Sequence, residues 1–299
     1  MNLQNFRYLV SVAETGSITR TSEELNVTQP AVSRGIAALE SELGVPLFDR
    51  LPKKMQLTRF GEIALRRGRA IFQQIEQTQQ EIDDIRSQSG SRFSIGAGPV
   101  WLSELLPQAI RLTADEMSWA SIEIIGGYER YLVELLRRGE VSFVLAEITQ
   151  DPEFLDLDME PLTSADYSLL ARPGHPLATG EPVELSDLLR YSWIMPSSAV
   201  NAQNRLTGLF NSQGMSAPEP EIASTSLSFI SKFVSISDHI TFLVESSQSR
   251  AEGLVRIPTH VPLPRRVAGI QRRKNDWLNP EATRVIEHLR VLSQDIESH

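Results

Sequence analysis

The chain has 299 residues, of which 41% are hydrophobic and 22% are charged. These values are ordinary for globular proteins, so they exclude a collagenous, low-complexity or mostly disordered chain, and the length predicts about two domains. The sequence holds no Cys, which excludes disulfides, thiolate metal sites, iron–sulfur clusters and a cysteine nucleophile. The five His lack the spacing of metal ligands. We therefore expect no metal and no cofactor.

Charge is unevenly distributed along the chain. The net charge is −9, which by itself argues against nucleic-acid binding. Residues 1–69, however, carry ten basic and seven acidic residues, whereas the other 230 carry 19 basic and 31 acidic ones. A mildly basic head on an acidic body makes the head a candidate DNA-binding part. No apolar run is long enough to span a membrane, and residues 1–15 do not resemble a signal peptide, so we expect a cytoplasmic protein without membrane contact.

The head has the pattern of three short helices. Apolar residues recur at helical spacing in residues 3–13, and Gly16 then ends the first helix. Ser17 can cap a second helix and Thr28 a third. Two short helices joined by a tight turn, at about residues 18–37, are typical of a helix-turn-helix.

The polar face of the third helix carries side chains that suit DNA. Gln can pair with adenine and Arg with guanine in the major groove, while hydroxyls and the first N–H groups of a helix can reach phosphates. Residues 47–57 then predict a strand, a basic turn and a second strand, which form a wing. The candidate DNA-binding residues are Thr28, Gln29, Pro30, Ser33, Arg34, Arg50, Lys53 and Lys54. The alternative is a small helical bundle with a solvated, charged surface.

Residues 17–61 closely resemble the N-terminal domain of LysR-type transcriptional regulators. The matching segments are 16–18, 27–33, 36–40, 43–44, 47–50 and 57–61. The resemblance implies a winged helix-turn-helix over residues 1–59 that binds an interrupted inverted repeat in double-stranded promoter DNA. Thr21 and Ser22 stand where the family usually has two alanines. Gly35 lies in mid-helix and removes a side chain that often lies beside the DNA, so base readout at this position stays open.

A long helix is expected from a cap at Thr58 to about Gln88. Its apolar seam has spacings of 4, 3, 4 and 3 and consists of Ile71, Ile75, Thr78, Ile82 and Ile85. This period is that of a coiled coil, and Gly68 and Ala64 extend it with small residues. Because the other faces are polar, self-pairing is favoured over packing on the chain's own body. The resemblance implies the same dimerising linker over residues 60–90, hence a homodimer, and extends the assembly to a homotetramer.

From residue 91 strands alternate with helices, which predicts a parallel sheet flanked by helices. Strands are expected at 93–96, 121–125, 142–145, 167–171, 193–195 and 240–244, and helices at 101–114, 129–138, 201–212, 226–235 and 281–292. Ligands bind such sheets at the carboxyl ends of the strands. The candidate effector-binding residues lie there, and they are Gly98, Pro99, Val100, Trp101, Tyr128, Ser197, Ser198, Thr225 and Ser226. Free N–H groups and hydroxyls in these loops would cradle a small anion, although each alone could be an ordinary helix cap.

In its pattern the body resembles the LysR-type effector domain, which is similar to type 2 periplasmic binding proteins. The resemblance implies two subdomains around a cleft that holds a small-molecule effector, subdomain I at about 91–163 and 266–299 and subdomain II at about 164–265. RNA polymerase is a further candidate partner. The expected fold class is thus α/β multidomain: an N-terminal all-α winged helix-turn-helix, a long linker helix and a two-subdomain α/β body over residues 91–299. Trp101 and Tyr128 favour a larger or aromatic effector.

Three other functions can be compared with this interpretation of the sequence. An enzyme is disfavoured, because Trp101 replaces the third glycine of a dinucleotide fingerprint at residues 96–101. No Gly-x-Ser-x-Gly elbow accompanies Asp238 and His239. A sensor that acts through protein partners is disfavoured by the polar face at residues 29–34. A DNA-binding protein without a ligand, whose body only assembles oligomers, stays open.

Overall fold

The structure is a computed structural model of the chain, and it describes residues 1–51, 54–87, 91–149, 154–197, 199–274 and 276–297. The chain divides into two compact units. One, the head unit, is built on Met1–Gln88, and the other, the body, on Ser89–Leu136 with Glu140–His299. Among the described residues, no helix is both long and apolar enough to cross a membrane.

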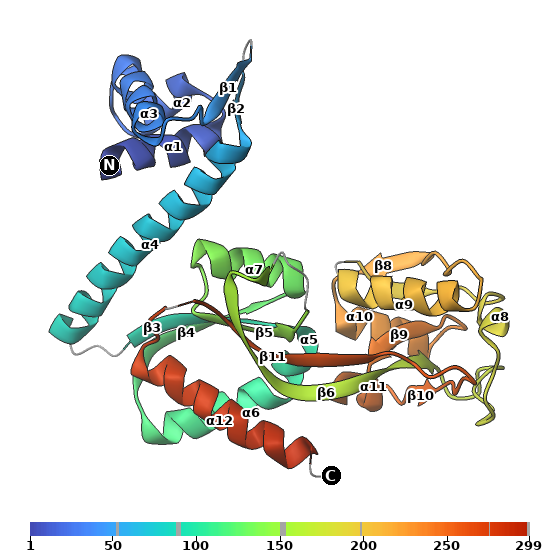
Figure 1. Cartoon of the computed structure of the whole chain (residues 1–299). Helices are drawn as coiled ribbons and strands as arrows, with labels where there is room; N and C mark the ends of the chain where they lie inside the picture. Colours follow the sequence, from blue (N-terminus) through green and yellow to red (C-terminus); the bar gives the residue numbers. More distant parts are fainter. Residues whose placement is uncertain (52–53, 88–90, 150–153, 198, 275, 298–299) are drawn as a thin grey trace. The chain divides into compact units, whose positions relative to one another are not determined.

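The head unit contains helices and one hairpin in the order α1 (Leu3–Thr15), α2 (Ile18–Glu24), α3 (Gln29–Leu43), β1 (Phe48–Leu51), β2 (Lys54–Leu57) and α4 (Arg59–Ser87) (Figure 1). Local chemistry sets several boundaries. Gly16 and Gly44 end α1 and α3 with φ of +67° and +69°, a conformation that glycine adopts without strain. Ser17 Oγ accepts the N–H of Arg20 at the start of α2, and Thr58 Oγ1 accepts that of Gly61 at the start of α4.

The core of the head unit lies between α1 and α3. Its largest fully buried side chains are Leu9, Ile36, Leu39 and Leu47. Thr21 and Ser22, which replace the expected alanines, are buried as well, and Thr21 Oγ1 lies 2.9 Å from Thr15 Oγ1. The small polar residues therefore pack with their hydroxyls partnered, as burial of a polar group requires.

Gly35 does not lie on the exposed face of α3, where the sequence analysis had expected the position to be beside the DNA. It is buried against α1, and a Cβ there would lie 2.3 Å from Cδ2 of Tyr8. The glycine thus lets two helices approach closely. Gly68 of α4 does the same, since its Cβ would lie 3.0 Å from Cδ1 of Phe6. The small residues expected to extend the self-pairing seam therefore pack on the chain's own α1.

The first sheet of the body has the strand order β4–β3–β5–β11–β6. Its strands are β3 (Ser91–Ala97), β4 (Trp119–Gly126), β5 (Phe143–Glu147), β6 (Leu157–Ala171) and β11 (Arg265–Arg273). Its helices are α5 (Pro99–Ser103), α6 (Leu105–Glu116), α7 (Glu129–Arg138) and α12 (Pro280–Glu297). The sheet is mixed and not wholly parallel as expected, because β11 pairs antiparallel with both β5 and β6 while β3 is parallel to β4 and β5.

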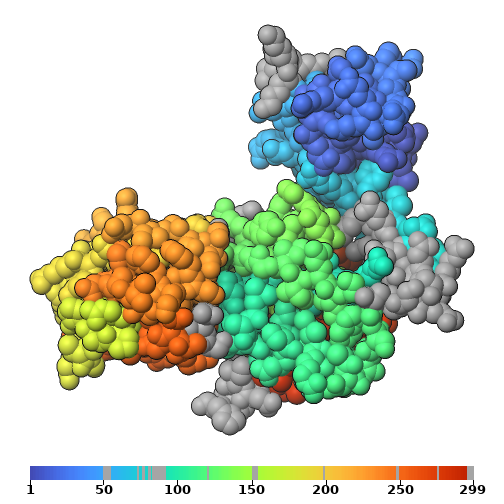
Figure 2. All heavy atoms as spheres, turned by 180° about the vertical axis from the view of Figure 1, so that it is seen from behind, coloured from blue at the N-terminus to red at the C-terminus, as the bar shows by residue number. Residues whose placement is uncertain are grey.

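The second half of the body is built around the end of β6. Residues Tyr167 to Leu170 of β6 pair with β9 (Thr241–Val244), and its last residues pair with β10 (Val255–Arg256). The other elements are α8 (Leu185–Leu188), β7 (Ile194–Pro196), α9 (Val200–Ser212), β8 (Ile222–Ser224), α10 (Leu227–Ser235) and α11 (Ser247–Ala251). In the space-filling view the yellow and orange atoms of this half form a mass beside the green atoms of the first half (Figure 2).

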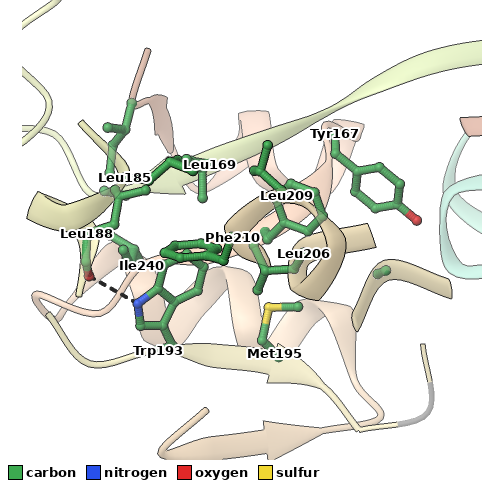
Figure 3. Packing of buried hydrophobic residues seen from close by; sticks show 14 of the residues in the cluster. Tyr167, Leu169, Leu185, Leu188, Trp193, Met195, Leu206, Leu209, Phe210 and Ile240 are labelled. Atoms are coloured by element: carbon green, nitrogen blue, oxygen red, sulfur yellow. Dashed lines mark hydrogen bonds between the residues drawn. The ribbon is translucent and has the colours of Figure 1, made fainter. Parts of the chain in front are cut away.

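The core of the second half is an apolar cluster around Trp193 and Phe210. Their rings meet edge to face at 6.3 Å, and Trp193 Nε1 donates to the carbonyl of Leu188 at 3.2 Å (Figure 3). Figure 3 also shows Tyr167 at the margin of this cluster, with its hydroxyl directed away from the other labelled residues. That hydroxyl reaches the site described below.

The two halves are joined by two strands that lie side by side. β6 and β11 pair antiparallel from Leu157↔Arg273 to Asp166↔Arg265, and β6 then continues into the second half. The register shifts at Gly269, where a Cβ would lie 2.0 Å from the carbonyl oxygen of Glu160. Residues 157–166, to which the sequence analysis assigned no element, form the first part of β6.

The helix expected over 101–114 is two helices. The chain breaks at Glu104, with φ −123° and ψ −85°, between α5 and α6. Pro107 explains the break, because it has no N–H to give to the carbonyl four residues earlier and its ring would clash with that carbonyl in a continuous helix.

Candidate functional site

The first candidate site is the exposed face at the start of α3. Thr28, Gln29, Pro30 and Arg34 are exposed and Ser33 is half-buried, so the structure brings these five predicted residues together on one helix end. Among the described residues, Gln29, Ser33 and Arg34 make no side-chain hydrogen bond or ion pair within the chain. Their donors and acceptors are available to a groove of DNA.

Thr28 differs in one respect from its expected role. It has the extended backbone of an N-cap residue, but its hydroxyl makes no capping hydrogen bond. In the first turn of α3, Pro30 has no N–H and the N–H of Ala31 donates to the carbonyl of Thr28 at 2.9 Å, so this helix start offers the hydroxyl of Thr28 and the N–H of Gln29. Such a helix start suits a phosphate oxygen.

The hairpin β1–β2 follows α3 and is held to it by one carboxylate. Glu40 Oε1 accepts the N–H groups of Leu47 at 2.7 Å and of Phe48 at 3.2 Å. Near the tip of the hairpin, Arg50 of β1 is paired with Met55, and Lys54 of β2 is paired with Leu51. Their side chains, and the whole of Lys53, lie outside the described part of the structure, so these three predicted DNA contacts stay predictions.

The apolar seam of α4 is not covered within the head unit. Ile75, Thr78 and Ile82 are exposed and Ile71 is half-buried. A shallow groove runs along this face and includes Leu3 of α1. A helix with an exposed apolar stripe gains most by pairing with a second copy of itself.

The second candidate site is a cavity between the two halves of the body. It offers about 60 Å³ to the centres of water molecules, several times the roughly 10–15 Å³ that one water needs. Most of its wall is apolar, and both halves contribute, with Trp101 and Ala146 from the first and Ala202 and Leu243 from the second. A concave, mostly apolar pocket with a few polar groups is the usual form of a small-molecule site, and this one is partly open to solvent.

Three charged residues, Glu129, Glu147 and Arg266, line this cavity, and a fourth, Arg205, pairs with Glu147. Glu147, at the end of β5, is 5% exposed in its side chain and pairs with Arg205 of α9. Arg205 donates from Nε and Nη2 to Glu147 Oε1 at 2.9 and 2.8 Å, and Tyr167 Oη donates to Glu147 Oε2 at 2.8 Å. Glu129, at the start of α7, accepts the N–H of Asn201 at 3.1 Å. Both carboxylates thus tie α9 of the second half to elements of the first.

Burial changes the ionisation of these groups. Desolvation raises the pKa of the Glu129 carboxyl, with the hydrogen bond from Asn201 acting in the opposite direction. Desolvation and the nearby Glu129 raise the pKa of Tyr128 to about 12, so its phenol stays protonated near neutral pH. The hydroxyl of Tyr128 and the indole Nε1 of Trp101 are buried without a hydrogen-bond partner. Unpartnered donors of this kind are costly unless a ligand or water meets them.

The structure separates the predicted effector residues into three groups. Gly98, Pro99, Val100, Trp101 and Tyr128 line the cavity. Thr225 lines an adjoining outer groove, while Ser197 and Ser226 line neither and Ser198 lies outside the described residues.

Part of the predicted anion cradle is used by the chain itself. The N–H groups of Gly98 and Ser197 donate to the carbonyls of Leu145 and Ser224, and Ser226 Oγ caps α10. Groups that are paired in this way are not available to a ligand, and the rest of the cradle stays a prediction.

Sequence reasoning missed the side chains that give the cavity its charge. Glu147 ends a strand that is otherwise apolar, and a charge at that place in a buried strand was the available signal. Arg266 is the second residue of β11, which carries four Arg, and nothing in that pattern distinguishes it from its neighbours. Arg130, two residues after Tyr128, is exposed and does not line the cavity. Among the described residues, no cluster of His, Asp and Glu could hold a metal ion.

Comparison with known proteins covers both units. Residues 3–62 match the model of the bacterial regulatory helix-turn-helix protein of the lysR family, and residues 86–293 match that of the LysR substrate binding domain. The HTH-type transcriptional regulator GbpR of Rhizobium radiobacter is 29% identical over 75% of this chain and 75% of its own.

Solved structures agree in fold. HinK, a LysR family transcriptional regulator from Pseudomonas aeruginosa, is 21% identical over 99% of both chains, with a TM-score of 0.57. Full-length CbnR complexed with its target DNA is 19% identical over 97% of this chain and 99% of its own, with a TM-score of 0.59. Two family models that together cover most of the chain, in the order that the winged head and the two-lobed body require, show that this chain belongs to the LysR family of bacterial transcriptional regulators.

Proposed function

We propose that this LysR-type regulator reads promoter DNA with the start of α3 and holds its small-molecule effector in the cavity between the two halves of the body. The observation that carries the proposal is the cavity itself, a partly open space whose wall is shared by both halves and includes two residues, Trp101 and Tyr128, that each hold a buried polar atom without a partner. A ligand there contacts both halves at once and biases their relative position. A coupling of about 1–3 kcal/mol is enough to change DNA occupancy usefully.

The DNA contact is assigned to Gln29, Ser33 and Arg34 for base edges and to Thr28, Arg50, Lys53 and Lys54 for the backbone. Self-pairing through the exposed seam of α4 places two copies of α3 on an interrupted inverted repeat. A homotetramer joins two such pairs through body surfaces. Regulation then passes to RNA polymerase at the promoter.

Arg34→Ala tests the base-reading assignment. It should weaken binding to the specific site by about 1–3 kcal/mol if Arg34 contacts a base with two hydrogen bonds. Arg111→Ala is the matched control, since it removes the same charge from an exposed position in α6 of the body. Gel shift against specific and unrelated DNA separates the effects, and unchanged specific binding by Arg34→Ala contradicts the assignment.

Ala202→Leu tests the cavity. Ala202 is 3% exposed and lines the cavity, so the three carbon atoms that leucine adds to this side chain fill space that an effector needs. Ala114→Leu, at an exposed position of α6, is the control. A thermal-shift screen of the full chain with carboxylates, aromatic acids, sugars and amino acids should find a stabilising compound, worth about 2.7 kcal/mol at 100 times its dissociation constant. The shift should vanish in Ala202→Leu only.

The regulator acts by binding and carries no catalytic role or cofactor in this proposal. Asp238 pairs with Arg172, at 2.6 Å between Oδ1 and Nη2, and His239 lies beside Glu221, so neither is arranged with a nucleophile. Turnover or NAD binding would contradict this. Because promoter DNA is its target, we place the protein in the cytoplasm.

The alternative is a regulator whose body only assembles oligomers. A flat screen of the folded chain, together with unaltered regulation in Ala202→Leu, would favour it over an effector.

A further inference from the structure

The polar groups around the cavity differ in whether the chain already uses them. Glu147 is fully engaged, because Arg205 donates to one of its oxygens twice and Tyr167 donates to the other. Arg205 is in turn neutralised by its ion pair with Glu147. This set therefore closes the wall of the cavity and has little capacity left for a ligand.

Arg266 and Glu129 are the charged groups that keep capacity. Both line the cavity, and among the described residues neither forms an ion pair. Arg266 is half-buried and makes no hydrogen bond within the described chain, so its five donors are unused. Glu129 is buried and accepts the backbone N–H of Asn201, and the charge of Arg266 favours its ionised form. A half-buried guanidinium without a partner is a site for a carboxylate, and a buried carboxyl group is a site for a hydroxyl donor.

Two further atoms restrict the ligand. Trp101 Nε1 only donates, and Tyr128 Oη can donate, and both are buried without partners in residues that line the cavity. A ligand that reaches either atom has to present an acceptor to it. The remaining wall is apolar, with Pro99, Leu227 and Leu243 among its residues, which favours a compact apolar ring over an extended polar chain.

We propose that the cavity binds a single-ring hydroxycarboxylate, whose carboxylate lies on Arg266 and whose hydroxyl donates to Glu129. This rests on the proposed function, in which the cavity is the effector site. A ligand that spans Arg266 on β11 and Glu129 on α7 while touching Leu243 on β9 contacts both halves of the body, so its binding is felt in their relative position.

The experiment is calorimetric titration of the full chain with matched probes. The three monohydroxybenzoates and the hydroxycyclohexanecarboxylates carry both groups, benzoate lacks the hydroxyl, phenol lacks the carboxylate and 4-hydroxybenzamide lacks the charge. At least one hydroxycarboxylate should bind about tenfold or more tightly than each probe that lacks one feature.

Two substitutions assign the groups. Arg266→Met should weaken that hydroxycarboxylate by about tenfold or more, as expected for a lost charged hydrogen bond. Arg265→Met should leave it unchanged, because neighbouring side chains of a strand face opposite sides and Arg265 is 66% exposed, bonded to Ser164. Glu129→Gln should reduce the preference for the hydroxylated probe over benzoate. Arg266→Lys retains the charge and serves if Arg266→Met fails to fold.

The outcomes separate the two levels of the proposal. If charged and neutral probes bind alike, or Arg266→Met and Arg266→Lys both bind as the wild type does, the assignment of the carboxylate to Arg266 is wrong. If amino acids or neutral sugars bind while the hydroxycarboxylates do not, the ligand class is wrong and the cavity remains the effector site. If no class binds and Ala202→Leu regulates normally, the effector site itself is wrong.

Discussion

Replacing Gly35 by Ala should destabilise the head unit, although alanine is the better helix former. The added Cβ would lie 2.3 and 2.8 Å from Cδ2 and Cε2 of Tyr8, and the ring is 7% exposed, so it has little room to move away. Overpacking costs about 1–3 kcal/mol, and contacts this short place the cost at the upper end. The gain in helix propensity offsets about 1 kcal/mol. A net loss of about 2 kcal/mol lowers the Tm of a unit of this size by about 8–16 °C.

Gly208→Ala is the matched control for this prediction. Gly208 also lies in mid-helix, in α9, but its Cβ would meet no atom within 4 Å. The same substitution should therefore stabilise the body by about 1 kcal/mol. Differential scanning calorimetry of the full chain measures both transitions. Equal signs for the two variants, or a raised Tm for the head unit in Gly35→Ala, would refute the close approach of α1 and α3.

Three further predictions follow from groups already described. Glu147→Ala should lower the free energy of unfolding of the body by about 3 kcal/mol, which urea unfolding measures. This is the lower end of the range for a broken buried ion pair, because the side chain of Arg205 is 33% exposed. A loss under about 1 kcal/mol would show that the pair is not buried in solution. Glu40→Ala should release the hairpin from α3 and lower the stability of the head unit by about 2 kcal/mol, because hydrogen bonds to a charged acceptor are lost. It should also weaken binding to all DNA sequences. Normal protection of the Leu47 amide from hydrogen exchange would contradict this prediction. The Tm of Glu129→Gln should rise relative to that of the wild type as the pH increases above about 4.3. Burial raises the pKa of the Glu129 carboxyl, so its ionisation destabilises the folded wild-type body, whereas glutamine does not ionise. A difference in Tm that stays constant with pH would show that Glu129 is not desolvated.

The sequence predicted the head unit well because its boundaries are set by local chemistry. Gly16, Ser17, Gly44 and Thr58 each act on residues within a few positions along the chain, which a one-dimensional pattern can show. Gly35 was misjudged because its role depends on Tyr8, which lies on another helix.

The cavity was predicted only in part for the same reason. The loops after the strands gave Gly98, Trp101 and Tyr128, since the topology of an α/β sheet brings strand ends together. Glu147 and Arg205 meet across 58 positions, and no periodicity in either segment indicates the partner. Which charges are used by the chain and which are left for a ligand is decided by these distant contacts.

The paired crossing of β6 and β11 has a mechanical consequence. A loop hinge lets two lobes swing freely, whereas here the crossing residues are held in a ladder of main-chain hydrogen bonds. Rotation of one lobe must therefore twist both strands together, and the close contact of Gly269 with the backbone at Glu160 leaves no slack at that point. The paired strands therefore resist a change in the angle between the two halves more than a single loop would, because such a change has to distort both strands and the hydrogen bonds between them.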